Sequence, residues 1–159
     1  MSGTIAFTLN RRKVTLAARD EDLLLHALRG TLGLTATRFG CGAEACGACM
    51  VLLDGVPVNS CTLELGRVAG REIVTVEGLG GPEAPHPIQT ALLAEQAGQC
   101  GYCLSGIQIA AAALLARTPD PSRTEVAEAL AGNLCRCGAH NRIIRAVQRA
   151  AAALRETRP

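Results

Sequence analysis

The chain has little net charge and no long apolar run. Its 16 Lys and Arg residues against 14 Asp and Glu leave a net charge of only +2. So small an excess excludes the electrostatic attraction that drives nonspecific binding to nucleic acid or to anionic membranes. No stretch reaches the roughly 18 apolar residues that a membrane-spanning helix needs, so we expect no direct membrane insertion.

The N-terminus also lacks the pattern of an export signal. Its first residues alternate like a strand, where a signal would show a basic region followed by an apolar segment. The Arg11-Arg12 pair is followed by Lys13 and not by an apolar stretch. We therefore expect neither a secretory nor a twin-arginine signal and place the protein in the cytoplasm, with export to the periplasm alongside a partner left open.

What the chain does have is eight cysteines. Without an export signal, such a number favours a reducing compartment, where structural disulfides are uncommon and thiolates are available as metal ligands. Metal binding is therefore the leading hypothesis.

The first half of the chain has mostly strand patterns. Apolar residues alternate on both sides of a turn at residues 10–12, as in a half-buried hairpin. Asp20 is suited to cap a helix that runs to Leu28 and stops at Gly30 and Gly33. Further strands are expected around the Asp54-Gly55 turn and beyond it, at residues 50–53, 56–58, 62–65 and 72–76.

The second half is expected to be helical. Residues 78–87 hold three glycines and three prolines without periodicity, which predicts a linker between domains 1–77 and 88–159. Four helices should follow: one beginning near Ile88, one over 107–115, one capped by Ser122 with Glu125, and one over 141–154.

The first four cysteines have the spacing of an iron–sulfur loop. The x4 and then x2 spacing is that of plant-type [2Fe-2S] sites, with a fourth thiolate arriving from further along the chain. Three glycines in this loop would let backbone N–H groups approach the cluster. Zinc, which favours paired C-x2-4-C knuckles, is the alternative. The set is Cys41, Cys46, Cys49 and Cys61.

The other four cysteines form two close pairs, Cys100 with Cys103 and Cys135 with Cys137. By spacing alone these pairs could hold an iron–sulfur cluster or zinc, or Cys100 and Cys103 could form a redox dithiol. The presence of the first set in the same chain favours a second cluster, because all eight cysteines are then used as ligands.

Three stretches around the cysteines occur in a fixed order: GCGAEACGACMVLLDGVPVNSC (40–61), QCGYCLSG (99–106) and GNLCRCG (132–138). They closely resemble the small iron–sulfur subunit of the molybdenum hydroxylases, the family of xanthine dehydrogenase and aldehyde oxidoreductase, and the resemblance runs from about residue 4 to residue 153. After the last cysteine pair, Gly138-Ala139-His140 looks most like the branch that acts on N-heteroaromatics and some aldehydes.

The resemblance implies an α+β fold, with an N-terminal β-grasp, plant-ferredoxin-like domain and a C-terminal four-helix domain, each holding one [2Fe-2S] cluster. It implies a large partner subunit with the substrate site and a molybdenum–pterin cofactor, expected as molybdopterin cytosine dinucleotide. A FAD subunit or a cytochrome c subunit is a candidate acceptor. Gln99 resembles the family glutamine that hydrogen-bonds the pterin, and Cys137 resembles the ligand near which the pterin approaches.

The function expected is electron transfer within a molybdenum-dependent oxidoreductase, by a chain with no substrate site of its own. A free-standing ferredoxin and a zinc-stabilised interaction module are the alternatives. His140 is expected to be a packing or interface residue in place of a metal ligand, and Glu44 a solvated carboxylate. Arg136 either eases reduction of an anionic cluster or is an ordinary surface cation.

Overall fold

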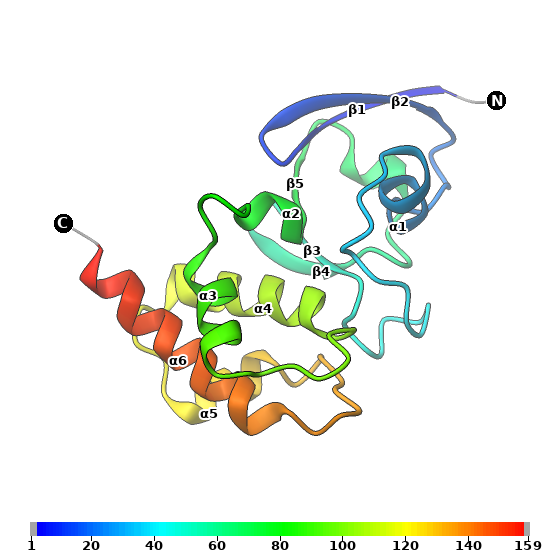
Figure 1. Cartoon of the computed structure of the whole chain (residues 1–159). Helices are drawn as coiled ribbons and strands as arrows, with labels where there is room; N and C mark the ends of the chain where they lie inside the picture. Colours follow the sequence, from blue (N-terminus) through cyan, green and yellow to red (C-terminus); the bar gives the residue numbers. More distant parts are fainter. Residues whose placement is uncertain (1–2, 158–159) are drawn as a thin grey trace.

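The computed structural model describes residues 3–157 and places a sheet and a group of helices side by side (Figure 1). The strands are β1 (Gly3–Leu9), β2 (Arg12–Ala18), β3 (Met50–Leu53), β4 (Val56–Asn59) and β5 (Glu72–Val74). The helices are α1 (Leu24–His26), α2 (Val76–Leu79), α3 (Pro87–Ala94), α4 (Leu104–Arg117), α5 (Arg123–Ala129) and α6 (His140–Glu156). A π-helical turn, η1 (Ala27–Thr31), and a 3-10 turn, η2 (Leu65–Val68), complete the elements.

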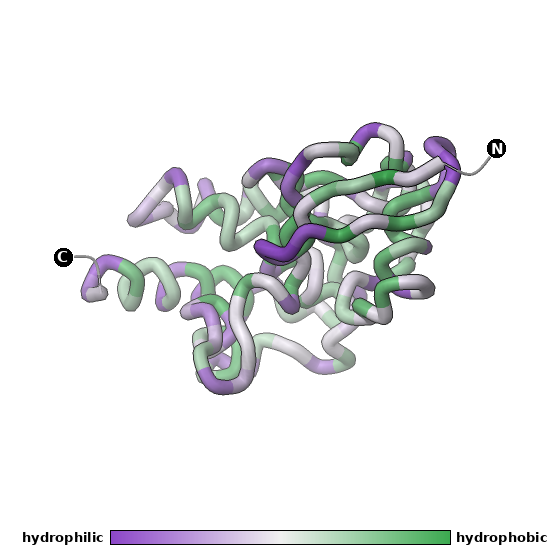
Figure 2. Tube along the Cα trace, turned by 90° about the horizontal axis from the view of Figure 1, so that it is seen from above, coloured by the Kyte–Doolittle hydropathy of each residue, from purple (hydrophilic) through white to green (hydrophobic). Residues whose placement is uncertain are grey.

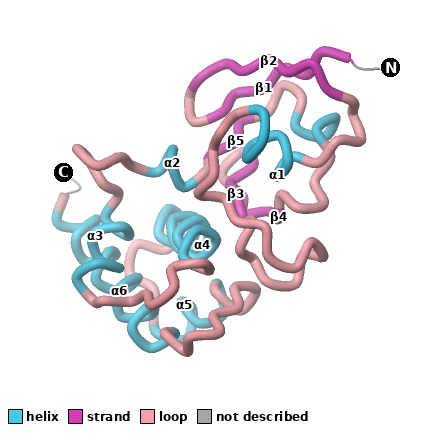
Figure 3. Tube along the Cα trace, turned by 45° about the vertical axis from the view of Figure 1, so that its right-hand side comes forward, coloured by secondary structure: helices cyan, strands magenta, loops and turns pink. Residues whose placement is uncertain are grey.

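The five strands form one mixed sheet in the order β2-β1-β5-β3-β4. Only β1 and β5 are parallel, and the other neighbours are antiparallel. The strands lie in one half of the molecule, while α3 to α6 occupy the other (Figure 3). Sheet and helices are thus segregated, which confirms the predicted α+β class.

Both predicted hairpins are present, and their turns explain why. Asn10 and Arg11 have φ angles of 49° and 67°, and Asp54 and Gly55 have φ angles of 48° and 80°. Two consecutive positive φ angles match the twist of a two-residue hairpin, and Asn, Asp and Gly tolerate them best. The Asp54 carboxylate also accepts a hydrogen bond from the Arg71 guanidinium at 2.7 Å, which ties this turn to the residue before β5.

Two apolar clusters form the core. One packs the inner face of the sheet against α1 and η1, with Phe7, Leu28 and Ile73 almost fully buried. The other lies among α3, α4, α5 and α6, with Ile107 and Ile143 almost fully buried. Figure 2 shows hydrophobic residues along the inner strands and helix faces, with hydrophilic residues gathered at turns and chain ends. Each half therefore buries an apolar cluster of its own.

Several expectations for the first half are wrong. The strand expected over residues 72–76 ends at Val74, because α2 begins at Val76. Residues 62–65 form no strand: Glu64 makes a single bridge to Leu23, and η2 begins at Leu65. Leu65 and Val68 are both buried, and a spacing of three suits a helical turn better than a strand. Asp20 caps no helix either, because α1 begins only at Leu24 and its N-cap Leu23 makes no side-chain bond.

The helix expected to stop at Gly30 also runs further. Gly30 lies inside η1, which ends at Thr31, and the chain turns at Gly33 with a φ of +67°. A glycine with a left-handed φ just past a helix is a usual terminator, so Gly33 acts as expected while Gly30 does not.

The four C-terminal helices are confirmed. Ser122 and Glu125 form the predicted capping box, with the Ser122 N–H donating to the Glu125 carboxylate at 2.7 Å. A second capping box, missed from the sequence, starts α3: His86 Nδ1 accepts from the Ile88 N–H, and the His86 N–H donates to Gln89. Burial lowers the pKa of His86, which suits a neutral imidazole that accepts a hydrogen bond.

α2 lies at the start of the predicted linker, so part of 78–87 is helical. The domain limits 1–77 and 88–159 stay a prediction. Among residues 3–157, no helix is both long and apolar enough to cross a lipid bilayer.

Candidate metal centres

The loop that carries the first cysteines wraps its own backbone N–H groups around their sulfurs. The N–H groups of Ala43 and Ala45 lie 3.3 and 3.2 Å from Cys41 Sγ. The N–H of Cys41 lies 3.4 Å from Cys46 Sγ. Such contacts stabilise negative charge on sulfur, and the contact from Ala43 lowers the pKa of Cys41 to about 7.

A glycine makes this wrapping possible. A Cβ on Gly40 would lie only 2.6 Å from Cys46 Sγ, so any larger residue would push the sulfur away. The turn also needs left-handed backbone at Gly42 and Gly47, with φ angles of +68° and +70°. The loop therefore forms a cradle of N–H groups around thiolates, which fits an anionic iron–sulfur cluster.

The other two cysteines of the first set, Cys49 and Cys61, are buried away from solvent. Cys49 is 1 % exposed and Cys61 is 4 % exposed, and both pack with Leu25. Burial raises the pKa of Cys49 to about 11, so this thiol is not ionised at neutral pH on its own. Bound metal would displace the proton, because a coordinating thiol is deprotonated.

The second set lies where three helices meet. Cys103 is the N-cap of α4, Cys100 lies just before it, and Cys135 and Cys137 lie between α5 and α6. The Sγ atoms of Cys100 and Cys137 are 3.5 Å apart, which brings residues 37 positions apart into contact. The N–H of Tyr102 lowers the pKa of Cys100, whereas burial raises the pKa of Cys103 to about 12.

All eight cysteines are free thiols, four in each set. Among residues 3–157, no three His, Cys, Asp or Glu side chains converge on a point that could hold a single metal ion. A [2Fe-2S] cluster divides four thiolates between two iron atoms and requires no such convergence.

Hydrogen bonds and a cation–π contact join the segments that carry the two cysteine sets. The N–H of Leu134, next to Cys135, donates to the carbonyl oxygen of Cys46 at 3.0 Å. The Tyr102 hydroxyl donates to the Phe39 carbonyl, and the Arg38 guanidinium lies 5.4 Å from the Tyr102 ring centre, a cation–π contact. The sequence gives no signal for these contacts, because more than 60 residues separate the partners.

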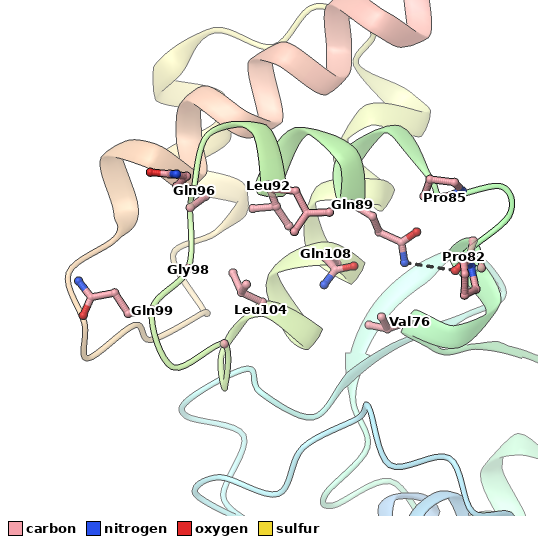
Figure 4. A pocket seen from close by; sticks show the side chains of 15 residues that line it. Val76, Pro82, Pro85, Gln89, Leu92, Gln96, Gly98, Gln99, Leu104 and Gln108 are labelled. Atoms are coloured by element: carbon pink, nitrogen blue, oxygen red, sulfur yellow. Dashed lines mark hydrogen bonds between the residues drawn. The ribbon is translucent and has the colours of Figure 1, made fainter.

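Gln99 lies at one end of a groove of about 740 Å³ between α3, α4 and the segment after α2. Figure 4 shows Gln99 at this end and Val76 and Pro82 at the other, with Gln108 between them. Gln108 Oε1 is buried and has no hydrogen-bond partner among the described residues.

A smaller polar pocket of about 270 Å³ lies on the other side of Gln99. Arg142, Arg145 and Gly138, the residue after Cys137, line it. Cys137 itself does not line this pocket, but its Sγ lies 3.5 Å from the Sγ of Cys100, the residue after Gln99. His140 is exposed at the start of α6, and Glu44 and Arg136 lie near the surface of their loops.

Comparison with protein families gives a match for each half. A family described as "2Fe-2S iron-sulfur cluster binding domain" matches residues 7–72, and one described as "[2Fe-2S] binding domain" matches residues 75–148. Fold and matches together define a protein with two iron–sulfur cluster domains.

Similar proteins show which kind of iron–sulfur protein this chain is. The chain is 48 % identical over 151 residues to a nicotinate dehydrogenase subunit of Pseudomonas putida, covering 95 % of this chain and 96 % of the relative. It is 47 % identical over 148 residues to the alpha subunit of isoquinoline 1-oxidoreductase of Brevundimonas diminuta, covering 92 % and 97 %. The crystal structure of quinoline 2-oxidoreductase from Pseudomonas putida 86 contains a chain that matches with a TM-score of 0.92 at 37 % identity, over 98 % of each chain.

The chain belongs to the small iron–sulfur subunits of the molybdenum hydroxylase family. Relatives of similar length are named as subunits of oxidoreductases, and in other relatives the match is one part of a longer chain. The role of this chain is electron transfer within such an enzyme. This confirms the family and the function predicted from the sequence over a free-standing ferredoxin or a zinc-stabilised module.

Proposed function

We propose that this chain carries electrons from a molybdenum–pterin site in a large partner subunit to an acceptor, while that enzyme hydroxylates an N-heteroaromatic or an aldehyde. Hydroxylation with oxygen from water converts a C–H bond to C–OH and releases two protons and two electrons. When bound, two [2Fe-2S] clusters supply one-electron redox chemistry. The observation that carries the proposal is the hydrogen bond from the N–H of Leu134, the residue before Cys135 of the second set, to the carbonyl oxygen of Cys46 in the first set.

Each cysteine set would hold one cluster. In the first set the backbone N–H groups around Cys41 and Cys46 would stabilise the charge of an anionic cluster, and the buried Cys49 and Cys61 would exclude water from its inner side. The second cluster would be held by Cys100, Cys103, Cys135 and Cys137. We also retain the division into domains 1–77 and 88–159, joined by residues 78–87.

Gln99 and Cys137 would face the pterin. The Gln99 amide has two donors and an acceptor, which suits the edge of a pterin ring, and its side chain is exposed. Arg142 and Arg145, which line the adjoining pocket, would favour an anionic ligand. We propose the molybdopterin cytosine dinucleotide form of the cofactor, which carries such phosphate charge.

The partner would be a large molybdopterin-binding subunit in the cytoplasm, and a FAD subunit or a cytochrome c subunit would receive the electrons. The N-heteroaromatic class is favoured by the names of the relatives, which refer to nicotinate, isoquinoline and quinoline.

The decisive experiment counts metal and reads spectra on the purified chain. We expect about four iron and about four inorganic sulfide per chain, with two distinct EPR signals after dithionite reduction. Iron-free protein that holds two zinc ions would reject the proposal. Expression with neighbouring genes should in addition co-purify a large subunit, while the chain alone should show no substrate hydroxylation.

A further inference from the structure

Three successive carbonyl groups in the first cysteine loop each accept a hydrogen bond from the helical half. The Cys46 carbonyl accepts from the Leu134 N–H at 3.0 Å. The Gly47 carbonyl accepts from Asn133 Nδ2 at 3.3 Å, and the Ala48 carbonyl accepts from the Ser105 hydroxyl at 2.9 Å. We call these three bonds the loop clamp.

Both side-chain donors of the loop clamp lie beside cysteines of the second set. Ser105 follows Cys103 by two residues, and Asn133 precedes Cys135 by two. Asn133 is 3 % exposed and Ser105 is 6 % exposed, so water does not compete for either bond. The loop clamp therefore links the loop of Cys46 and Cys49 to both cysteine pairs of the other set.

The backbones of the two halves meet closely at the loop clamp. A Cβ on Gly106 would lie 1.8 Å from the Gly47 carbonyl oxygen, and a Cβ on Gly47 would lie 2.4 Å from the Gly132 carbonyl oxygen. Glycine at both positions allows the first loop to rest directly on the start of α4.

An asparagine at the buried position 133 lowers the stability of the fold unless its amide makes a needed hydrogen bond. Its Oδ1 is buried without a hydrogen-bond partner among the described residues, and an unpaired buried acceptor destabilises the fold. Leucine, of similar volume, would avoid that cost. What asparagine supplies and leucine lacks is the Nδ2 donor, which lies 3.3 Å from the Gly47 carbonyl oxygen and 3.5 Å from the weaker acceptor Met50 Sδ. The bond to Gly47 therefore explains the residue.

We propose that Asn133 and Ser105 are positioning residues that hold the two cysteine sets at a fixed separation and orientation. Transfer between two redox sites falls steeply with their separation, so supporting contacts that keep the sites in place set the rate. The inference rests on the proposed assignment of the eight cysteines as cluster ligands.

The test uses the assembled enzyme with Asn133→Leu, Asn133→Asp and Ser105→Ala. Asn133→Leu keeps the volume without the donor, and Asn133→Asp keeps the shape but turns an acceptor toward the Gly47 carbonyl. Ser122→Ala, which removes a hydroxyl from the capping box of α5, is the matched control because it costs helix stability away from the loop clamp.

The readout is the magnetic coupling between the two reduced clusters, measured by pulsed EPR, together with the inter-cluster transfer rate. We expect the Asn133 and Ser105 variants to keep both clusters, to show a broadened distribution of couplings, and to transfer electrons severalfold more slowly. Ser122→Ala should match the wild type in both quantities. Ser105→Thr, which keeps the hydroxyl, should restore most of the rate.

Unchanged coupling and rate in Asn133→Asp and Ser105→Ala would overturn the inference while leaving the proposed function intact. Wild-type protein without iron would overturn both. If the Asn133 variants do not fold, Ser105→Ala decides the question, because it removes one bond with little change of volume and buries no charge.

Discussion

The Leu134 N–H and the Cys46 carbonyl oxygen, 3.0 Å apart, join two segments that each carry a cysteine of a different set. Both partners of this bond are backbone atoms. A side-chain substitution at Cys46 therefore leaves the bond available, and the two sets can be perturbed one at a time.

Cys46→Ser should abolish the first cluster and preserve the second. Iron should fall from about four to about two per chain, with one EPR signal lost. Cys135→Ser is the reciprocal variant and should remove the other signal. Loss of both signals from folded Cys46→Ser protein would contradict the division of the cysteines into two sets.

Gly40→Ala should damage the first site without removing any ligand. The added Cβ would lie 2.6 Å from Cys46 Sγ, so the sulfur or the loop must move. Overpacking of this kind costs about 1–3 kcal/mol. Thermal unfolding should show a lower midpoint and earlier loss of visible absorption. Gly30→Ala is the control, because a Cβ there meets nothing within 4 Å; equal behaviour of the two variants would remove the steric argument.

Gln99→Ala should slow reduction of the second cluster by substrate in the assembled enzyme. The proposed hydrogen bond to the pterin would contribute about 0.5–1.5 kcal/mol, more if its loss left a partner group buried and unpaired. Stopped-flow measurements should show the slower step, with transfer between the two clusters near its original rate. Gln148→Ala, on α6 and outside the pockets that Gln99 lines, should leave both steps unaltered. Substrate reduction at the wild-type rate with full cofactor occupancy would show that Gln99 has no contact with the pterin.

Glu95→Gln should weaken the attachment of α6 to α3 modestly. Hydrogen bonds from Arg145 and Arg149 lower the pKa of Glu95 below its usual 4.5. A lowered pKa in the folded state means that the stabilisation is fully present above pH 4.5 and is lost as the pH falls through the folded value.

The measurement is the difference in thermal midpoint between wild type and Glu95→Gln. This difference should shrink at high salt, because both arginines are largely exposed. Glu128→Gln, at an exposed residue that makes no ion pair among residues 3–157, should have a midpoint close to that of the wild type at any salt concentration. A salt-independent difference for Glu95→Gln would mean that the ion pairs do not carry the effect.

Local patterns explain most of what could be predicted from the sequence. Asp54 and Gly55 readily adopt the positive φ angles that a tight hairpin turn needs. Ser122 and Glu125 lie within four residues and provide hydrogen-bond partners for the backbone N–H groups at the start of α5. The family could be recognised because each of the three cysteine-containing stretches is a short continuous motif, and the three occur in a fixed order.

The strand that is absent and the contacts that were not predicted have physical causes of a different kind. Leu63 alternates with Leu65 like a strand, but the pairing stops after the single bridge between Glu64 and Leu23, and Leu65 already begins the 3-10 turn η2. Asn133 and Ser105 gave no local signal, because their acceptors lie 86 and 57 residues away. Contacts of this range appear only once the chain has folded.

Because Gly47 and Gly106 lie so close together, the two halves are held by their own contacts and not by the exposed segment 81–85 that connects them. Opening the molecule at this segment would break the hydrogen bonds at Cys46, Gly47 and Ala48 together, so the segment is a tether and not a hinge. A protease cut there should leave both pieces associated, and the spacing of the two redox sites would be independent of the length of chain that connects them.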